Sequence, residues 1–582
     1  DFDDLLLLPV QLLKQNNEVR AYWHHRFKHI LVDEYQDTNH TQYELIKLLV
    51  TNGISPELYN EWKDRSVFVV GDADQSIYSF RAADFRILMG FQNDFGDNKD
   101  DSKSNTMVKL ERNYRSTSTI LKAANALISN NKERIDKVLL PTRSEGELIN
   151  LTRCDDEIAE AEDVVHRLKL INSLNENYSW KDIAILYRTN AQSRSIEESL
   201  VRWRVPYLVV GGLKFYDRRE IKDVLSYLKL LINPSDSLSL LRIINVPRRG
   251  VGKTTIQRLS DAASQLGIPL WDIVSDTEAI LSLAGRSSKG ILKFLDLIDE
   301  LNTDKERDSP SLMIQNVIEK SGYIKELLSE ATDESEERRR NLQELVNAAL
   351  QYEEENDDGN LEGFLASAAL ASDADNKDTE ANRVTLMTLH SSKGLEFPYV
   401  FLVGVEQGLF PSYRSIDDPS SLEEERRLCY VGITRAKEKL FISHVSERRM
   451  WGGMREPAIP SIFLSEIPEE LLKGDIPFTS GASIRKDNHL NRLTRVDRKY
   501  SESKQTKFSY SSPQNAVRKM HSGPKAGQAW SIGDKVKHLH FGSGEITHIF
   551  GEGEKISIAV KFKGMGPKIL DPRLAPIEHL NN

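Results

Sequence analysis

The sequence contains little cysteine, no long apolar run and no excess of positive charge. Its 582 residues include two cysteines, Cys154 and Cys429, too few for a disulfide framework or for a zinc site made of cysteines. Charged residues or proline interrupt the apolar stretches before they reach the length that spans a membrane. The formal net charge is −10, so a nucleic-acid partner would need a local basic surface. We therefore expect a cytoplasmic protein with no membrane contact.

The sequence also lacks the phosphate-binding pattern G-x-x-x-x-G-K-[ST]. Its nearest approach is VPRRGVGKTT at 246–255, where Pro247 occupies the position of the first glycine and an apolar helix replaces the preceding strand. A glycine turn before a helix can instead bind a duplex phosphate through free backbone N–H groups. The alternative is a turn that only connects two helices. On the first interpretation, the duplex-contact residues are Arg248, Arg249, Gly250, Gly252 and Lys253.

Two carboxylates follow an apolar strand pattern near the start of the chain. Residues 30–32 (ILV) predict a buried strand, and Asp33 and Glu34 come directly after it. At the carboxyl end of a parallel strand, an aspartate can hold Mg²⁺ and an adjacent glutamate can activate a water molecule. The alternative is a strand that ends in acids because it meets solvent, and the pair alone does not decide between the two.

Strand patterns alternate with helix patterns in two blocks, which predicts parallel α/β sheets. Further strands are expected at 66–71 and 106–110 in the first block, and at 183–186 and from Arg383 onward in the second. A mostly helical segment interrupts the second block, and a polar, basic segment follows that block. Short strands with glycine turns at the end of the sequence predict a small β-barrel.

Five segments together carry a specific resemblance. They are DEYQDTN at 33–39, GDADQSIYSFRAAD at 71–84, ERNYRS at 111–116, TLHSSKGLEF at 388–397 and EEERRLCYVGITRAK at 423–437. In content, order and spacing, the chain resembles UvrD/PcrA-type superfamily 1A DNA helicases, and the PcrA branch in particular. The resemblance implies an α/β protein with two RecA-like parallel-sheet domains, a helical insertion domain and a Tudor-like or SH3-like β-barrel. The implied limits are 1–110 for the incomplete first RecA-like domain, 111–210 with 381–470 for the second, 211–380 for the insertion, 471–528 for a disordered basic linker and 529–582 for the barrel.

The resemblance also implies an ATP site that both RecA-like domains share. Asp33 would hold Mg²⁺, Glu34 would activate the attacking water and Gln75 would sense the γ-phosphate. Arg115 and Arg435 would neutralise charge on the transferred phosphoryl group, although each could instead form a surface ion pair. Further ATP contacts are expected at Tyr114, Gly394 and Glu396.

Single-stranded DNA would bind an aromatic loop, because bases stack on aromatic rings and arginine contacts the phosphates. The loop residues are Tyr78, Phe80 and Arg81, and His390 and Ser391 would contact the DNA backbone. Most relatives carry tryptophan where this chain has Phe80, whose smaller ring still stacks. The alternative is that Phe80 belongs to the hydrophobic core.

We therefore expect an ATP-dependent 3′-to-5′ helicase that translocates on single-stranded DNA and unwinds duplex DNA in repair and replication. RNA polymerase, through the barrel, and repair accessory proteins are the further partners that the resemblance implies. The sequence opens at Asp1 inside an amphipathic pattern, so we expect a truncated chain that does not hydrolyse ATP by itself. The alternative is a non-catalytic module that binds DNA and RNA polymerase and retains helicase ancestry.

Overall fold

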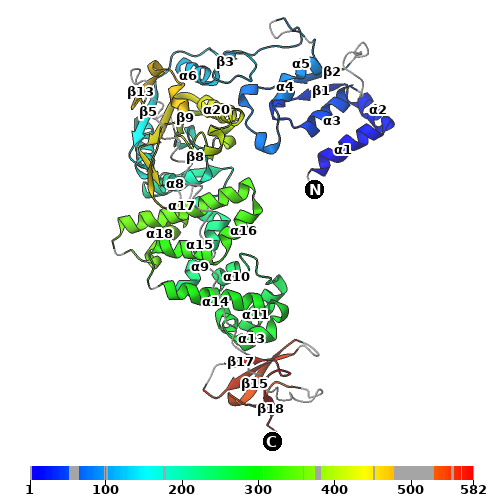
Figure 1. Cartoon of the computed structure of the whole chain (residues 1–582), viewed down its shortest axis with the longest axis vertical. Coiled ribbons are helices and arrows are strands. Elements are labelled where there is room, and N and C mark those ends of the chain that lie inside the picture. Colours follow the sequence, from blue (N-terminus) through cyan, green and yellow to red (C-terminus); the bar gives the residue numbers. More distant parts are fainter. Residues whose placement is uncertain are drawn as a thin grey trace, which may run out of the picture. The chain divides into compact units, whose positions relative to one another are not determined.

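The computed structural model divides into two compact units (Figure 1). The first unit comprises Asp1–Arg218 with Leu370–Phe478, and the second comprises Arg219–Ala369 with Thr479–Asn582. The first segment of the second unit, Arg219–Ala369, thus begins and ends close to the limits expected for the helical insertion. The expected basic linker lies almost entirely outside the described residues, which are 3–51, 65–97, 99, 103–174, 179–305, 307–357, 359–373, 382–449, 453–477, 530–551, 556–564 and 567–580.

A seven-stranded parallel sheet organises the first unit. The strand order is β13-β5-β10-β9-β6-β8-β7, so strands from before and after the insertion are interleaved in one sheet. The expected second domain ended at residue 470, but β13 follows that position and pairs with β5. The strands are β5 (Ile149–Cys154), β6 (Ile183–Tyr187), β7 (Tyr207–Val210), β8 (Val384–Thr388), β9 (Phe397–Leu402), β10 (Ala436–Val445) and β13 (Leu472–Gly474).

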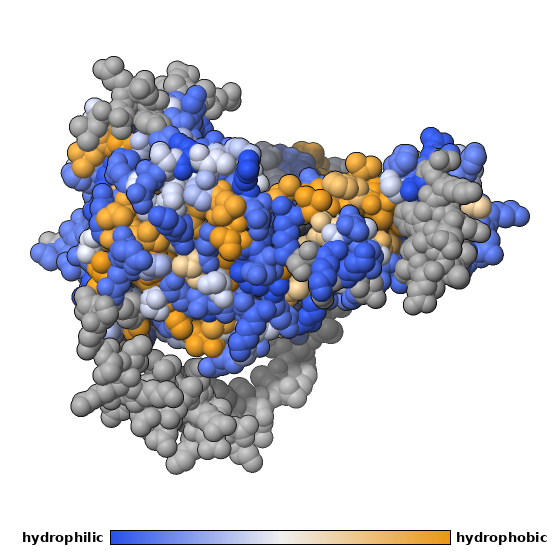
Figure 2. Space-filling view, turned by 90° about the horizontal axis from the view of Figure 1, so that it is seen from above, coloured by the Kyte–Doolittle hydropathy of each residue, from blue (hydrophilic) through white to orange (hydrophobic). Residues whose placement is uncertain are grey.

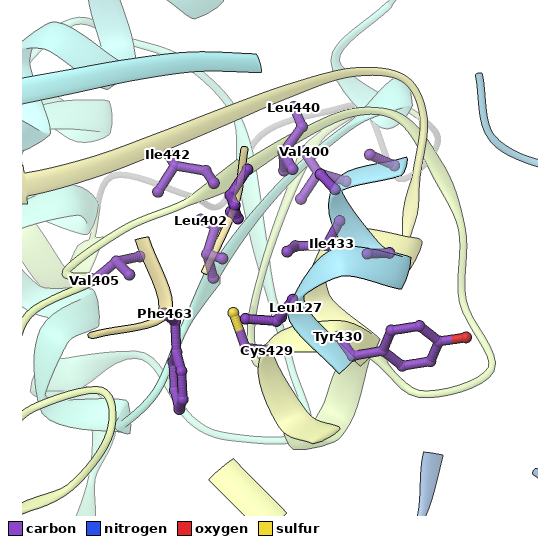
Figure 3. Packing of buried hydrophobic residues seen from close by; sticks show 14 of the residues in the cluster. Leu127, Val400, Leu402, Val405, Cys429, Tyr430, Ile433, Leu440, Ile442 and Phe463 are labelled. Carbon is purple, nitrogen blue, oxygen red and sulfur yellow. The ribbon is translucent and has the colours of Figure 1, made fainter. Parts of the chain in front are cut away.

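Helices cover both faces of this sheet, because successive residues of a strand point to opposite faces. Leu186 of β6 packs in a cluster with residues of α6 and α20, whereas its neighbour Ile185 packs with residues of α7 and α8. Figure 3 shows Leu127 of α6 and Cys429 of α20 in the first cluster, together with strand residues such as Val400. The predicted α/β fold is confirmed. The covering helices are α6 (Ser118–Ile128), α7 (Glu157–Leu174), α8 (Ser193–Arg202) and α20 (Pro419–Thr434).

The first 97 residues contain a smaller parallel sheet of two strands, β1 and β2. Leu31 pairs with Phe68 across this sheet, and the two residues are 74% and 60% exposed. The prediction of a buried strand at 30–32 is therefore wrong for this chain, and β2 is equally open, because no described residues cover that face. Exposed apolar residues are also visible in the space-filling view (Figure 2). The elements here are α1 (Asp4–Gln15), α2 (Asn17–Arg26), β1 (His29–Val32), α3 (His40–Thr51), β2 (Ser66–Val69), α4 (Arg86–Met89) and α5 (Phe91–Asp94).

The strand expected at 106–110 does not form. Val108 and Leu110 are 81% and 79% exposed, and the backbone pairs with a second segment only later, at β3 and β4. The apolar residues of this stretch therefore do not pack into a sheet. The remaining short elements of the first unit are β3 (Arg112–Asn113), β4 (Leu140–Pro141), α19 (Tyr413–Ile416), β11 (Glu447–Arg449), β12 (Arg455–Pro457) and α21 (Ile462–Ser465).

The second unit contains the helical insertion and a small antiparallel sheet. The sheet has five strands in the order β17-β16-β15-β14-β18 and encloses its own core around Val536 and Phe562, as the predicted barrel requires. In the part of the chain that the structure describes, no helix has the length and apolarity needed to cross a membrane. The helices are α9 (Arg219–Ile232), α10 (Ser237–Ile243), α11 (Lys253–Leu266), α12 (Leu270–Val274), α13 (Thr277–Leu283), α14 (Ser288–Lys305), α15 (Pro310–Lys320), α16 (Tyr323–Glu330), α17 (Asp333–Glu355) and α18 (Leu361–Asp373), and the strands are β14 (Lys535–His538), β15 (Gly542–Phe550), β16 (Ser557–Phe562), β17 (Pro567–Leu570) and β18 (Ile577–His579).

Candidate nucleotide site and DNA surface

The carboxylates Asp33 and Glu34 leave the carboxyl end of β1 on an exposed turn. Glu34 has a φ of +50°, a left-handed conformation that costs a residue other than glycine about 1–3 kcal/mol. The Asp33 carboxylate accepts a hydrogen bond from the Glu34 N–H at 2.8 Å, and the Gln36 side chain donates to the Glu34 carboxylate at 2.5 Å. The strained turn therefore presents two adjacent carboxylates in fixed directions.

Gln36 is a site residue that the sequence analysis missed. Its side chain is fully buried, and its Oε1 accepts the N–H of Asp72 at 2.9 Å while its Nε2 holds Glu34. A Cβ on Gly71 would lie 2.7 Å from Gln36 Oε1, so a larger residue there would displace the Gln36 side chain. Gln36 thus connects the turn after β1 with the turn after β2. The only signal in the sequence was its place inside the segment DEYQDTN.

Arg435 lies at the end of α20 and is 1% exposed. Its guanidinium donates to the carbonyl oxygens of Val431 and Leu395 at 3.0 and 3.1 Å, and to the Gln75 side-chain oxygen at 3.4 Å. Burial, with the like charge of Arg115 nearby, lowers the pKa of Arg435 to about 10, which leaves it charged at neutral pH. The structure therefore brings a buried cation at the end of α20 to Gln75, in the segment after β2.

Arg115 and Glu396 face each other beside Arg435. Arg115 Nε donates to Glu396 at 2.5 Å, and Lys437 forms a second ion pair with Glu396 at 2.7 Å. These two cations lower the pKa of the Glu396 carboxyl group to about 2. Tyr114 is 72% exposed, so its ring is available for stacking. Gly394, which was also expected at the ATP site, occupies an open turn with a φ of +83°.

Lys393 is a second residue that the sequence analysis did not single out. Its ammonium group donates to both carboxylate oxygens of Asp37 at 2.6 and 2.8 Å, and to the Gln75 carbonyl oxygen at 2.8 Å. It also lies 5.1 Å from the centre of the Tyr78 ring. One partly buried lysine therefore contacts the segment after β1, the segment after β2 and the aromatic loop.

Four of the expected DNA-binding residues of the first unit lie together: Tyr78, Phe80, Arg81 and His390. The Phe80 ring is 55% exposed and packs edge-on against His390 at 5.5 Å, which excludes the alternative of a core position. Arg81 lies over the rings of both Tyr78 and Phe80, at 5.5 and 5.4 Å. The Tyr78 hydroxyl donates to the His390 carbonyl oxygen at 3.2 Å. This aromatic surface is built from two segments more than 300 residues apart.

His390 and Ser391 follow β8 on a single helical turn. Burial lowers the pKa of His390 from 6.5 to about 3, so the imidazole is neutral at physiological pH. Ser391 Oγ lies 3.0 Å from the Thr388 hydroxyl, and the Ser391 N–H donates to that hydroxyl at 3.2 Å. A neutral His390 supports the Phe80 ring through packing and adds no charge to the surface.

The two arginines of the glycine turn before α11 have different surroundings. Arg249 donates to the carbonyl oxygens of Ile243, Val246 and Pro247 at 2.9–3.2 Å, and to the Tyr227 hydroxyl at 2.7 Å. Arg249 was expected to contact DNA, but its guanidinium is already engaged in the hydrogen bonds that hold the turn. Exposed positions are Arg248, Gly250, Gly252 and Lys253, and no side chain caps α11 at Gly252.

A metal ion would need ligands from outside the protein at this site. Among the described residues, no group of three or more histidine, cysteine, aspartate or glutamate side chains is arranged to hold a metal. Mg²⁺ commonly binds one or two carboxylates and completes its shell with phosphate oxygens and water. The exposed Asp33 carboxylate fits that mode of binding.

Three family models match the chain. The UvrD/REP helicase N-terminal domain matches residues 1–96, the UvrD-like helicase C-terminal domain matches 108–447 and the PcrA/UvrD tudor domain matches 532–579. The second of these alone spans more than half of the sequence. The chain therefore belongs to the UvrD-like helicase family, and the predicted resemblance is confirmed.

Individual relatives extend the match over nearly the whole chain. The ATP-dependent DNA helicase PcrA of Staphylococcus aureus (strain Mu50 / ATCC 700699) is 40% identical over 585 residues, which cover 99% of this chain and 74% of the relative. The ATP-dependent DNA helicase PcrA of Staphylococcus epidermidis (strain ATCC 12228 / FDA PCI 1200) is 39% identical over 581 residues, with the same coverage.

Proposed function

We propose that this chain is the larger part of an ATP-dependent DNA helicase that moves 3′ to 5′ on single-stranded DNA. The observation that carries the proposal is the contact between Arg435 and Gln75. It joins the arginine side of the second RecA-like domain to the domain that carries Asp33 and Glu34. An ATPase shared by two domains needs this arrangement, because closure must bring cations to phosphates held by the other domain.

The residues of this site have separate roles toward ATP. Mg²⁺, when bound, neutralises phosphate charge, and Asp33 would hold it. Glu34, oriented by Gln36, accepts a proton from the attacking water. Arg115 and Arg435 stabilise charge on the transferred phosphoryl group, and arginines in this role contribute about 10³–10⁵-fold in rate. Tyr114 offers its exposed ring to the adenine, with Gly394 and Glu396 near the sugar.

Lys393 couples ATP hydrolysis to the DNA-binding surface. This lysine contacts Asp37 and the Gln75 carbonyl group on the nucleotide side and the Tyr78 ring on the DNA side. A change in the position of Gln75 therefore alters the support of the aromatic loop. Tyr78 and Phe80 stack on bases, and Arg81 contacts phosphates. Arg248, Lys253 and the free N–H groups at the start of α11 would contact duplex DNA ahead of the strand.

We propose further that the chain alone hydrolyses no ATP. It has no G-x-x-x-x-G-K-[ST] segment to hold the β- and γ-phosphates, and it spans 74% of the relative from Staphylococcus aureus. The exposed face of Leu31 and Phe68 is also the kind of apolar surface that further strands or helices would cover. A segment with the phosphate-binding loop would complete both the sheet and the site.

The test is ATP hydrolysis in the presence of single-stranded DNA by two proteins. One is the chain itself, and the other is a joined protein in which the unmatched part of the Staphylococcus aureus relative precedes Asp1. We expect DNA-stimulated hydrolysis and duplex unwinding only from the joined protein. Unwinding of substrates with a 3′ but not a 5′ single-stranded tail tests the direction. Tight DNA binding without hydrolysis by the joined protein favours the non-catalytic module instead.

The barrel is proposed to contact RNA polymerase, which would connect the helicase to repair. Three lysines, Lys535, Lys561 and Lys563, outnumber the single carboxylate, Glu545, in a groove beside Leu580 on the barrel surface. Such a groove is complementary to an acidic segment with an apolar residue. The double substitution K561E/K563E should weaken binding of the full chain to RNA polymerase core enzyme in a pull-down, whereas K537E on β14 should not. Equal binding by all three proteins contradicts the proposal.

A further inference from the structure

Two carboxylates of the segment after β2 form ion pairs with the second RecA-like domain. Asp74 is 1% exposed at its side chain, and Arg134 donates to its two oxygens at 2.8 and 3.2 Å. Lys137 forms an ion pair with Asp72 and lies 3.7 Å from Asp74. Arg134 also donates to the Lys137 carbonyl oxygen at 3.1 Å, which fixes the segment that carries both cations.

Asp72 in turn orients Gln75. Its Oδ1 accepts the Lys137 ammonium group and the Asp74 N–H, and its Oδ2 accepts Gln75 Nε2 at 2.7 Å. A carboxylate only accepts hydrogen bonds, so the amide must present its nitrogen to Asp72. The Gln75 oxygen then points to Arg435, which donates to it. The direction of the amide is thus determined by a chain of contacts that begins at Lys137.

We propose that Lys137 is a positioning residue for Gln75, acting through Asp72, with Arg134 holding the segment in place. The proposal rests on the proposed function, in which Gln75 senses the γ-phosphate. Lys137 lies outside the five recognised segments, and its side chain is 17% exposed. Without its charge, the Asp72 carboxylate loses its fixed position and the amide can rotate. The cation therefore determines which end of the amide meets Arg435 and the nucleotide.

A purely structural role for Lys137 would lower stability without changing turnover. The two roles separate in the joined protein, where we expect K137M to lower the DNA-stimulated kcat about tenfold, since misplacing a catalytic group can reduce rates up to about 100-fold. The KM for ATP and the affinity for single-stranded DNA should change little. K137R, which keeps the charge, should restore most of the rate. The matched control is K122M, which breaks the exposed ion pair between Lys122 and Glu145.

A second measurement uses the chain without the added segment and does not depend on ATP hydrolysis. The melting temperatures of K137M, Q75A and the double variant test whether the two residues act together. We expect the double variant to lose clearly less than the sum of the single losses, because Q75A already removes the group that Lys137 positions. Additive shifts, or an unchanged kcat for K137M in an active joined protein, overturn the proposal. An inactive joined protein with non-additive shifts overturns the proposed function but leaves the positioning contact established.

Discussion

Lys393 Nζ lies 2.6 and 2.8 Å from the two carboxylate oxygens of Asp37, so the pair is bidentate on the acid. The residues are separated by 356 positions in the sequence, with Asp37 in the segment after β1 and Lys393 in the segment after β8. Lys393 is 7% exposed at its side chain and Asp37 is 21% exposed. The ion pair is therefore largely shielded from water, and it connects the segment after β1 with the segment after β8 beside Gln75.

Removal of this lysine should be costly. K393M leaves the Asp37 carboxylate without its cation, and breaking a buried pair from one side lowers the free energy of unfolding by about 3 kcal/mol. Urea unfolding of the chain measures the effect. The control K122M disrupts an exposed pair and should lower the same free energy by less than about 1 kcal/mol. Equal losses of unfolding free energy in the two variants would show that the Lys393–Asp37 pair contributes no more to stability than an exposed pair.

Phe80 should contribute directly to binding of single-stranded DNA. A stacked base is worth about 1–3 kcal/mol, so F80A should weaken binding of the chain to oligo(dT) by about tenfold or more in fluorescence anisotropy. F80W has a larger ring and should bind more tightly than the unsubstituted chain. Y22A removes another exposed aromatic ring and is the control. Unchanged affinity in F80A contradicts a stacking role.

His390 should make stability depend on pH. Its pKa is lowered from 6.5 to about 3 in the folded chain, so the unfolded chain binds a proton first as the pH falls. The folded state is therefore destabilised between pH 6.5 and 3, by at most about 1.4 kcal/mol per pH unit. H390Q removes this contribution, so its unfolding free energy should fall less steeply below pH 6.5. If the unfolding free energies of H390Q and the unsubstituted chain changed with pH in parallel, His390 would not be the source of the pH dependence.

Substitution of Arg249 should affect stability, whereas substitution of the adjacent Arg248 should affect binding to duplex DNA. R249A removes a guanidinium that donates to four carbonyl oxygens and the Tyr227 hydroxyl, so it should lower the melting temperature. R248A should leave the melting temperature unchanged and weaken binding to duplex DNA, with a smaller dependence of affinity on salt. K293A, on α14, is the control for a lost surface charge. If R249A lost more duplex affinity than R248A while both variants kept the same melting temperature, Arg249 and not Arg248 would be the DNA contact.

The sequence predicted the strands that are covered on both faces better than those that are not. Apolar patterns located β6, expected at 183–186, and the strands expected from Arg383 onward, because their neighbours in the sheet lie within this chain. The same kind of pattern at Leu31 and Phe68 predicted buried strands, but burial depends on partners that local residues do not specify. Val108 and Leu110 show the same limit, since an apolar stretch without an adjoining strand stays irregular.

The site was predictable as a set of segments and less so as a set of contacts. Asp33, Glu34, Gln75 and Arg435 stand inside segments that the family resemblance marks. Gln36 and Lys137 act through hydrogen bonds to residues 36–65 positions away, and such pairings have no local signature. Arg249 shows the reverse case, because a basic residue in a loop resembles a DNA contact until its acceptors are known.

The central claim is that Arg435 and the carboxylates after β1 belong to one ATPase site. The most direct measurement is the DNA-stimulated kcat of the joined protein with R435K, which keeps the charge but removes the planar donor set, and with R435A. We predict losses of about 10³-fold or more for R435A and a substantial loss for R435K, with single-stranded DNA affinity retained. R167A, on the surface of α7, should have no effect. Turnover within about twofold of the unsubstituted protein in R435A, at unchanged melting temperature, would contradict the account.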